Sequence, residues 1–233
     1  MTKQPYPILY SLHNCPYAIR ARMALVKAKQ VVEIRSIKLS NKPIEMVEVS
    51  PKGSVPVLVL PKPMNDEPLL VIDESLDIML WALNKSDPYN LLQQTHRNEL
   101  DEMLDFIKHF ENRFIPALEA YAAAKRYHQE NRAELRKVCE GELVQLEGLL
   151  NKHRFLLSDK ESLVDIALVP FIRKLARVDK PWFRDGPFPY VRDWLNGYLN
   201  SRLFSEVMTQ YDIWHEHQNA VYFGDKNKLG NKK

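Results

Sequence analysis

Short apolar runs alternate with helical patterns over the first third of the chain. Four runs rich in Val, Ile and Leu have the length and composition of strands, at residues 7–11, 31–37, 55–60 and 69–72. Apolar positions at helical spacing predict helices over residues 16–29, 43–49 and 74–83. The predicted order is therefore βαβ, then α, then ββα, with residues 61–68 as a hairpin loop between the third and fourth strands.

The strand pattern stops after residue 84, and long helical patterns follow. They cover residues 95–123, 129–151, 162–177, 188–199 and 201–210. Pro116 is expected to bend or interrupt the first of them, because proline removes a helical hydrogen bond. The fold class is α/β plus all-α, with a first domain over residues 1–84, a linker over 85–94, an all-helical domain over 95–223 and a disordered basic tail over 224–233.

A capping pattern marks the start of one of these helices. Ser162 precedes the apolar run that begins at Ile166, and Asp165 lies three positions after Ser162. Ser at the cap and an acidic residue three positions on can satisfy each other's backbone N–H groups. We interpret this pair as the start of a buried helix, without a chemical role.

Composition narrows the setting of the protein. The net charge of +3 resides in residues 225–233, which hold four Lys and one Asp, so the rest of the chain is neutral and lacks a basic patch for nucleic acid. The apolar runs are too short to cross a bilayer, and the N-terminal residues do not resemble a signal segment. Two cysteines and seven histidines without ligand spacing indicate a reducing, cytoplasmic setting and no metal site.

Residues 14–20, with the sequence Asn-Cys-Pro-Tyr-Ala-Ile-Arg, carry the strongest chemical signal. They place Cys15 between an apolar strand and a helix that begins with Pro16, a residue suited to the first helical turn. The free N–H groups and the positive end of the helix dipole favour an anion there, and hence a thiolate. A buried, inert cysteine is the alternative interpretation.

Two further motifs accompany Cys15. Residues 54–58, Ser-Val-Pro-Val-Leu, begin the third strand, and residues 72–75, Ile-Asp-Glu-Ser, open a helix. Cys-Pro at a strand-to-helix joint in this order of elements resembles the thioredoxin fold, in which the proline corresponding to Pro56 is cis and faces the active thiol. With its helical second half, the chain is similar to the cytosolic glutathione transferases over about residues 7–215.

Within that superfamily, the chain resembles most closely the omega class and related bacterial cysteine-type transferases. Residues 15–22, 38–43 and 50–58 are similar to their active-site helix, the following loop and the cis-proline segment. Each motif alone is weak, but their order and spacing together make a strong signal. The resemblance implies an N-terminal thioredoxin-like domain and an all-helical glutathione-transferase C-terminal domain.

The resemblance also implies how glutathione binds as a co-substrate. Glu74 and Ser75 would hold the ammonium and the carboxylate of its γ-glutamyl unit at a helix start. Val55 would pair its backbone with the cysteinyl unit, and Lys42 would meet the glycyl carboxylate. Cys15 would face the glutathione sulfur and form a mixed disulfide with it. Taken singly, Glu74 and Ser75 could be only a helix start and Lys42 only a solvated charge, but their coincidence favours binding.

Other candidate groups receive structural interpretations. Tyr10 lies near the position where other transferase classes place a catalytic tyrosine, but with Cys15 present we expect it to pack in its strand. Tyr17 is expected to pack as well. Ala18 occupies the place of the second cysteine in a C-x-x-C motif, so a dithiol mechanism is disfavoured. Cys139, in the middle of a predicted helix, is expected to be a packing residue.

A glutathione-dependent thiol transferase is therefore the expected function, with deglutathionylation or dehydroascorbate reduction as its reaction. The partner would be an unidentified electrophile or mixed disulfide. Its pocket is expected between the domains, although aromatic residues at helical spacing also suit a core. The candidates are His13, Phe114, Tyr121, Trp182 and Trp214.

The alternative is a non-catalytic binding or regulatory module on the same fold. Intracellular chloride-channel-like proteins, which also resemble the omega class, illustrate it. They would need a segment able to reorganise in a membrane, and no persuasive one is visible here. A homodimer is expected from the resemblance alone, and a monomer is the other possibility.

Overall fold

The computed structural model of the protein describes residues 6–61, 69–93 and 98–224. The chain divides into two compact units. The first consists of Met1–Tyr89 together with Leu203–Lys233, and the second of Asn90–Arg202. Among the helices of the described residues, none combines the length and the apolar character that crossing a bilayer requires.

A mixed sheet forms the centre of the first unit. Its strand order is β4-β3-β1-β2-β5, in which β1 runs parallel to β2 and antiparallel to β3, and β4 and β5 pair antiparallel with β3 and β2. The parallel pair requires a crossover, which the intervening helix provides. The strands are β1 (Ile8–Ser11), β2 (Val31–Ser36), β3 (Val57–Val59), β4 (Val71–Ile72) and β5 (Tyr222–Gly224).

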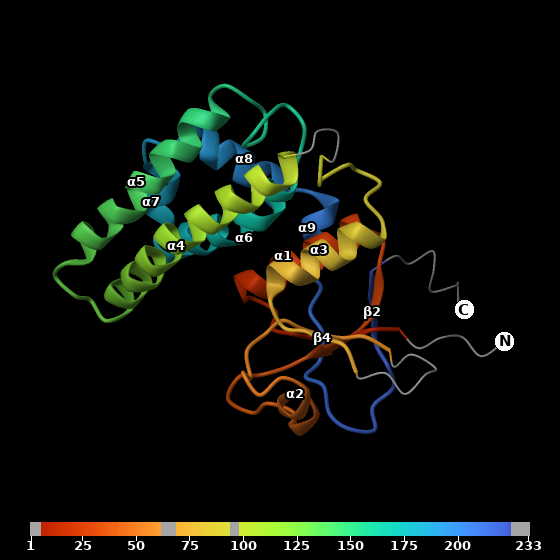
Figure 1. The fold of residues 1–233 in the computed structure, drawn as a ribbon. Coiled ribbons are helices and arrows are strands. Elements are labelled where there is room, and N and C mark those ends of the chain that lie inside the picture. The colour runs from red at the N-terminus through yellow and green to blue at the C-terminus, as the bar shows by residue number, and fades with distance from the viewer. Residues whose placement is uncertain (1–5, 62–68, 94–97, 225–233) are drawn as a thin grey trace. The chain divides into compact units, whose positions relative to one another are not determined.

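Three helices cover this sheet. Two of them, α1 (Pro16–Lys27) and α3 (Ser75–Lys85), pack against each other on one face, and α2 (Ile44–Val49) lies on the opposite face (Figure 1). The apolar side predicted for the first helix is buried, since Ile19 and Met23 are fully enclosed. The βαβ-α-ββα order and the thioredoxin-like sheet are therefore confirmed. The predicted hairpin loop lies almost wholly outside the described residues.

The end of the chain differs from the predicted boundary. We expected residues 95–223 to be helical, but residues from Leu203 onward belong to the first unit, where β5 extends the sheet beyond β2. Gly224 suits this pairing, because its φ is +112° and an added Cβ would lie 1.9 Å from the carbonyl oxygen of Gln30. The partner of β5 is β2, which lies far away in the sequence, so local pattern could not assign these residues to the sheet. Beyond Gly224, the predicted tail lies outside the described residues.

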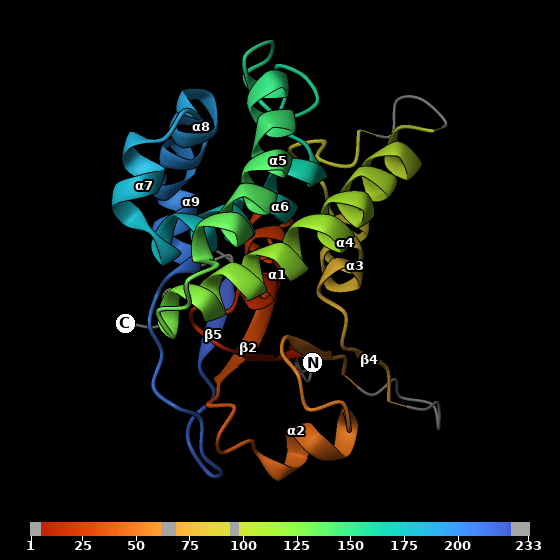
Figure 2. The same ribbon diagram turned by 90° about the vertical axis from the view of Figure 1, so that its left-hand side faces the viewer.

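The second unit is helical, as predicted. Its helix α4 packs against α5 and α6, and α8 packs against both α5 and α6 (Figure 2). Of the two effects expected of Pro116, interruption is excluded, because α4 continues through this residue, and the bend stays a prediction. The helices are α4 (Glu99–Arg126), α5 (Arg132–Leu150), α6 (Leu163–Val178), α7 (Lys180–Asp185), α8 (Pro189–Leu199) and, at the boundary of the units, α9 (Arg202–Val207).

The capping pattern predicted at residue 162 is present and buried. The N–H of Ser162 donates to Oδ2 of Asp165 at 2.9 Å, and both halves of the capping box are formed. Oδ1 of Asp165 also accepts from the backbone N–H of Leu156 at 3.0 Å and from Nε1 of Trp194 at 3.1 Å. The carboxylate therefore joins the start of α6 to the preceding loop and to α8, which agrees with a purely structural role.

Candidate functional site

Cys15 caps the N-terminus of α1, as the sequence predicts. Its backbone is extended, with φ −70° and ψ 123°, and Pro16 occupies the first helical position. The N–H of Cys15 donates to the carbonyl of Leu12 at 3.3 Å, and its carbonyl accepts the helical bond from Ile19 at 2.9 Å. The residue is partly exposed. A thiol is thus presented where free N–H groups and the helix dipole favour negative charge.

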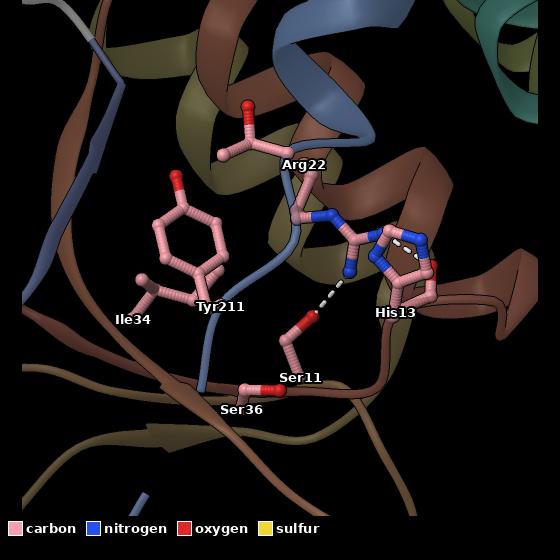
Figure 3. Close-up of a pocket in the computed structure, with 7 residues that line it drawn as sticks. Ser11, His13, Arg22, Ile34, Ser36 and Tyr211 are labelled. Atoms are coloured by element: carbon pink, nitrogen blue, oxygen red, sulfur yellow. Dashed lines mark hydrogen bonds between the residues drawn. The ribbon is translucent and has the colours of Figure 1, made fainter. Parts of the chain in front are cut away.

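Arg22 holds the loop that leads to Cys15. This arginine is only 2% exposed, and its guanidinium donates to Ser11 Oγ at 2.5 Å and to the carbonyls of Leu12 and His13 at 3.3 and 2.8 Å. Figure 3 shows the guanidinium beside Ser11 and His13, on one side of a small pocket that is bounded on the other by Tyr211. These acceptors compensate the cost of burying the positive charge of Arg22.

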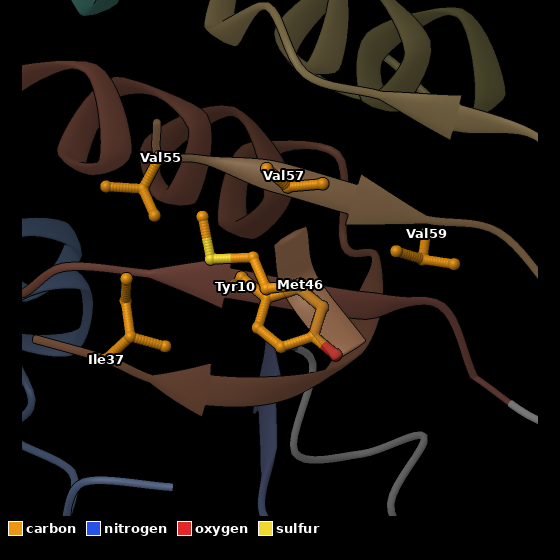
Figure 4. Packing of buried hydrophobic residues seen from close by; sticks show 6 residues of the cluster. All are labelled: Tyr10, Ile37, Met46, Val55, Val57 and Val59. Carbon is orange, nitrogen blue, oxygen red and sulfur yellow. The ribbon is translucent and has the colours of Figure 1, made fainter. Parts of the chain in front are cut away.

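The loop before β3 brings a second backbone group to the thiol. The Val55–Pro56 peptide bond is cis, and the carbonyl oxygen of Val55 lies 3.8 Å from Sγ of Cys15. Cys15 also packs against a buried apolar cluster, shown in Figure 4. The cluster comprises Tyr10, Ile37, Met46, Val55, Val57 and Val59. One side of the thiol thus meets apolar side chains while the residue as a whole keeps some solvent access.

The Lys42 side chain lies beside the same loop, close to Gly53. The φ of Gly53 is +62°, and a Cβ added there would lie 2.9 Å from Nζ of Lys42. The backbone conformation therefore favours glycine at this position, whereas the exposed end of the Lys42 side chain could shift away from an added Cβ. The Lys42 side chain is exposed, so its ammonium group lies beside the cis-proline loop and is open to an anionic ligand.

The N-terminus of α3 joins this loop through charged groups. Glu74, at the N-cap, forms an ion pair with Lys52, and both side chains are exposed. The hydrogen bond from Lys52 to Glu74 raises the pKa of the lysine. Beside them, the hydroxyl of Ser50 donates to Oδ2 of Asp73 at 2.9 Å. An exposed pair of this kind contributes roughly 0–1 kcal/mol, so a ligand ammonium can replace Lys52 at small cost.

Ser75 lies beneath this surface, at the first position of α3. It is 3% exposed, and its Oγ accepts a hydrogen bond from Nε of Arg20 at 2.9 Å. Arg20 is buried to the same extent, and its guanidinium carbon lies 5.3 Å from the centre of the Tyr17 ring. The bond ties α1, which Cys15 caps, to the helix that Ser75 begins. The hydroxyl hydrogen of Ser75 can still be donated to another acceptor.

The loop formed by residues 50–56 connects all the residues predicted to bind glutathione. Ser50 and Lys52 contact the start of α3, Gly53 lies under Lys42, and the carbonyl of Val55 faces Cys15. The structure therefore brings together side chains from four separate parts of the first unit. The N-termini of α1 and α3, the exposed ammonium groups of Lys42 and Lys52 and the partly exposed thiol of Cys15 line this region. Their chemistry suits an elongated anionic ligand that carries a sulfur atom.

Comparison with known proteins agrees with this arrangement. Residues 9–89 match the family model for the glutathione S-transferase N-terminal domain, and residues 94–197 match the model for the glutathione S-transferase C-terminal domain. The mouse protein glutathione S-transferase omega-1 is 31% identical over 175 residues, which cover 73% of this chain and 68% of the mouse protein. The chain belongs to the glutathione S-transferase family.

Solved structures of the family share the fold. A glutathione transferase family member from Pseudomonas fluorescens, solved with two glutathione molecules bound, has a TM-score of 0.75 and 17% identity, and the match covers 89% of this chain and 94% of that one. Glutathione transferase Omega 2C from Trametes versicolor has a TM-score of 0.68 and 22% identity, with 88% and 94% covered. The similarity to the omega class thus lies in the sequence of the mouse relative, and the solved structures show that the fold is shared.

Tyr10 and Cys139 have the packing roles expected for them. Tyr10 is 2% exposed, its hydroxyl accepts from Arg35 at 2.9 Å, and burial raises its pKa. Cys139 lies fully buried in α5, and burial raises the pKa of its thiol to about 12. Burial therefore keeps both the Tyr10 phenol and the Cys139 thiol protonated at neutral pH.

The residues expected to line a second-substrate pocket lie in both units. In the first unit, His13 lines the small pocket of Figure 3, and Trp214 packs its ring 4.4 Å from the Arg35 guanidinium carbon. In the second, Phe114 stacks on Phe110 with ring centres 4.5 Å apart. Tyr121 and Phe114 are buried, and Trp182 is half-buried. Their role in substrate binding stays a prediction.

Sequence reasoning did not assign Arg20, Arg22 or Lys52 a role. The two arginines interrupt the apolar side of α1, and a buried charge needs hydrogen-bonding partners, so their position was a usable signal. Their partners are far away in the sequence and could not be inferred. Within residues 6–61, 69–93 and 98–224, no group of His, Cys, Asp and Glu side chains has the arrangement of a metal site.

Proposed function

We propose that this protein is a glutathione-dependent thiol transferase with Cys15 as its nucleophile. The observation that carries the proposal is the position of Cys15 in a chain of the glutathione S-transferase family. Its partly exposed thiol lies at a helix N-terminus, 3.8 Å from the backbone carbonyl of Val55. This position provides a cysteine that can react as a thiolate, where many transferases use only a hydroxyl donor.

Glutathione has complementary groups for the surroundings of Cys15. Its γ-glutamyl carboxylate suits the N-terminus of α3 at Ser75, and its ammonium suits Glu74, which exchanges Lys52 for the ligand. The cysteinyl backbone would pair with Val55 in the manner of an added strand. The glycyl carboxylate would meet the exposed ammonium of Lys42. Binding of glutathione by the Pseudomonas fluorescens relative supports this assignment.

The proposed reaction has two thiol–disulfide exchange steps. The Cys15 thiolate attacks the glutathionyl sulfur of a mixed disulfide, forms an S–S bond with it, and releases the partner thiolate, which takes a proton from water. A glutathione thiolate then attacks the Cys15–glutathione disulfide, releases the Cys15 thiolate and leaves as glutathione disulfide. Over the cycle, the partner sulfur is reduced from the disulfide to the thiol level and the sulfur of the incoming glutathione is oxidised from the thiol to the disulfide level, while the transferred glutathionyl sulfur stays at the disulfide level.

A single cysteine suffices for this cycle. Ala18, which takes the place of a resolving cysteine, is fully buried in α1. Cys139 is buried in the second unit, and burial raises the pKa of its thiol to about 12. The second glutathione therefore does the work of a resolving thiol. Deglutathionylation of mixed disulfides and reduction of dehydroascorbate are the two reactions that this chemistry favours.

The experiment compares the wild type with Cys15→Ala and with Cys139→Ala as the matched control. The assay follows glutathione-dependent reduction of a glutathionylated peptide. We expect Cys15→Ala to lose the activity and Cys139→Ala to retain it, with both variants folded. Undiminished activity in Cys15→Ala would refute the mechanism. If the wild type binds S-methylglutathione but never reduces the peptide or dehydroascorbate, the alternative of a binding module is favoured. A homodimer and a cytoplasmic location stay predictions.

A further inference from the structure

Arg22 connects the loop before Cys15 to a distant part of the chain. Besides its bonds to Ser11, Leu12 and His13, its Nε donates to the carbonyl of Val207 at 3.0 Å. Val207 ends α9, which lies 185 residues further along the chain. The guanidinium is thus the point where the Cys15 loop meets the C-terminal segment, here defined as residues 207–214.

The carbonyl of Leu12 links this arginine directly to Cys15. It accepts one hydrogen bond from Nη1 of Arg22 at 3.3 Å and another from the backbone N–H of Cys15 at 3.3 Å. The turn between β1 and α1 therefore has its orientation set by a rigid planar group on α1 itself. A guanidinium can do this because its N–H groups point in fixed directions, whereas a lysine ammonium offers only a flexible point charge.

The C-terminal segment is itself anchored to the sheet at a separate place. The N–H of Trp214 donates to the carbonyl of Ser36 at 2.7 Å, and the Trp214 ring lies over Arg35. Arg35 is in turn fixed by Glu33 at 2.8 Å and by the hydroxyl of Tyr10 at 2.9 Å. Two arginines therefore contact the same segment, and Arg22 also donates hydrogen bonds to the loop that presents the thiol, as Figure 3 shows for Ser11 and His13.

We propose that Arg22 is a positioning residue for Cys15: by bonding the loop of residues 11–13 and the end of α9 together, it keeps the thiol aligned with the N-terminus of α1. The proposal rests on the proposed function in so far as Cys15 is the reacting group. It assigns the C-terminal segment a part in the reaction, although that segment contributes no reacting atom. The four bonds of Arg22 end on residues other than those proposed to bind glutathione, which are Lys42, Val55, Glu74 and Ser75.

The test separates reactivity of the thiol from binding of the ligand. The rate of Cys15 alkylation by iodoacetamide is measured by mass spectrometry at neutral pH. The dissociation constant of S-methylglutathione, which has no free thiol, is measured by calorimetry. We expect Arg22→Met to slow alkylation about tenfold, and Arg22→Lys to slow it less, because small misalignment of a reacting group costs rate. The dissociation constant is expected to stay within about twofold.

Arg35→Met is the matched control, since it loosens the C-terminal segment without touching the loop. We expect it to leave the alkylation rate unchanged. If Arg22→Met does not fold, Ser11→Ala, which removes the shortest of the four bonds, and Arg22→Lys decide the question. An unchanged rate in both of these variants would overturn the proposal.

Two other results would also overturn it: an equal slowing in Arg35→Met, or a parallel loss of alkylation and ligand binding in the Arg22 variants. The alkylation comparison needs no glutathione. A wild type that fails to bind S-methylglutathione therefore contradicts the proposed function, while the effect of Arg22 on Cys15 is still decided.

Discussion

The two units differ in what their buried charged groups hold in place. In the first unit, Arg20 and Arg22 are 3% and 2% exposed, and their hydrogen bonds end on residues next to the candidate site. In the second, Asp165 is fully buried, and its partners define the start of a helix and the packing of α8. A buried charge must be hydrogen-bonded in either case.

The two units differ in whether the hydrogen bonds of a buried charge involve the candidate site. In the first unit, Arg20 donates to Ser75 at the start of α3, and Arg22 donates to a carbonyl of the loop that precedes Cys15. The partners of Asp165 are a cap, a loop N–H and an indole inside a helical framework. We therefore expect mutation of Asp165 to change the stability of the protein. Mutations around Arg20 and Arg22 should instead change ligand binding and the reactivity of the Cys15 thiol.

The largest expected effect comes from Asp165→Ala. It leaves the N–H groups of Ser162 and Leu156 and the indole N–H of Trp194 without their acceptor, and because each such buried donor costs about 1–3 kcal/mol, the free energy of unfolding should fall by at least about 3 kcal/mol. Chemical denaturation measures the change in the free energy of unfolding. Under conditions where the variant is folded, the alkylation rate of Cys15 is expected to match the wild type, and a large fall in that rate would break the comparison.

Asp159→Ala is the control for this variant. Asp159 also accepts a backbone N–H, that of Arg154 at 2.9 Å, but it is exposed to solvent. Since water can replace the lost acceptor, the expected cost is below about 1 kcal/mol. An equal loss of stability in both variants would show that burial is not what makes Asp165 important.

A smaller effect is expected at the start of α3. Glu74→Gln removes the charge proposed to bind the ligand ammonium, and an exposed charge pair contributes roughly 0–1 kcal/mol, so the affinity for S-methylglutathione should fall by up to about fivefold. Calorimetry measures it. Asp77→Asn, on the exposed side of the same first turn, makes an equal change of charge and should alter the affinity less than twofold. Equal losses would indicate a general charge effect.

The last effect concerns the pH dependence of the second unit and appears only at high pH. Burial, helped by the hydrogen bond to Asp179, raises the pKa of Tyr121 from 10.0 to about 12. Below pH 10 the phenol is neutral in the folded and unfolded states; between pH 10 and 12 only the unfolded state ionises it. Its contribution to stability is therefore complete below pH 10 and is lost as the pH rises toward 12, by up to about 2 kcal/mol.

Tyr121→Phe provides the comparison for that measurement. The difference in ultraviolet absorbance between wild type and variant during a pH titration isolates one tyrosine among the ten of the chain. A midpoint near 10 would contradict the burial argument. The variant should also lose the extra pH dependence of its unfolding free energy.

The sequence was sufficient for features that depend on local pattern. Strand runs, the 3.6-residue period of α1 and the Ser162–Asp165 cap each involve residues within a few positions of one another, and all are found in the structure. The cis bond before Pro56 also lies where the resemblance implied it. The short helix α7 was missed, because its apolar residues Trp182 and Phe183 are adjacent and give no helical spacing.

Features that depend on distant pairing were not predictable. Strand β5 is stabilised by β2, which lies almost two hundred residues earlier in the chain, and Arg22 bonds to Val207 across 185 residues. The sequence showed arginines at buried helical positions but not their partners. The same holds for the pair between Lys52 and Glu74, which only the folded loop brings together.

The most direct test of the central claim is the mass of the intact protein after treatment with glutathione disulfide, with Cys15→Ala as the control. We predict that the wild type gains the mass of one glutathionyl group on Cys15, that reduced glutathione removes it, and that Cys15→Ala gains none. If iodoacetamide alkylates Cys15 in the wild type but glutathione disulfide adds no glutathionyl group, the claim that Cys15 is the nucleophile of thiol transfer is contradicted.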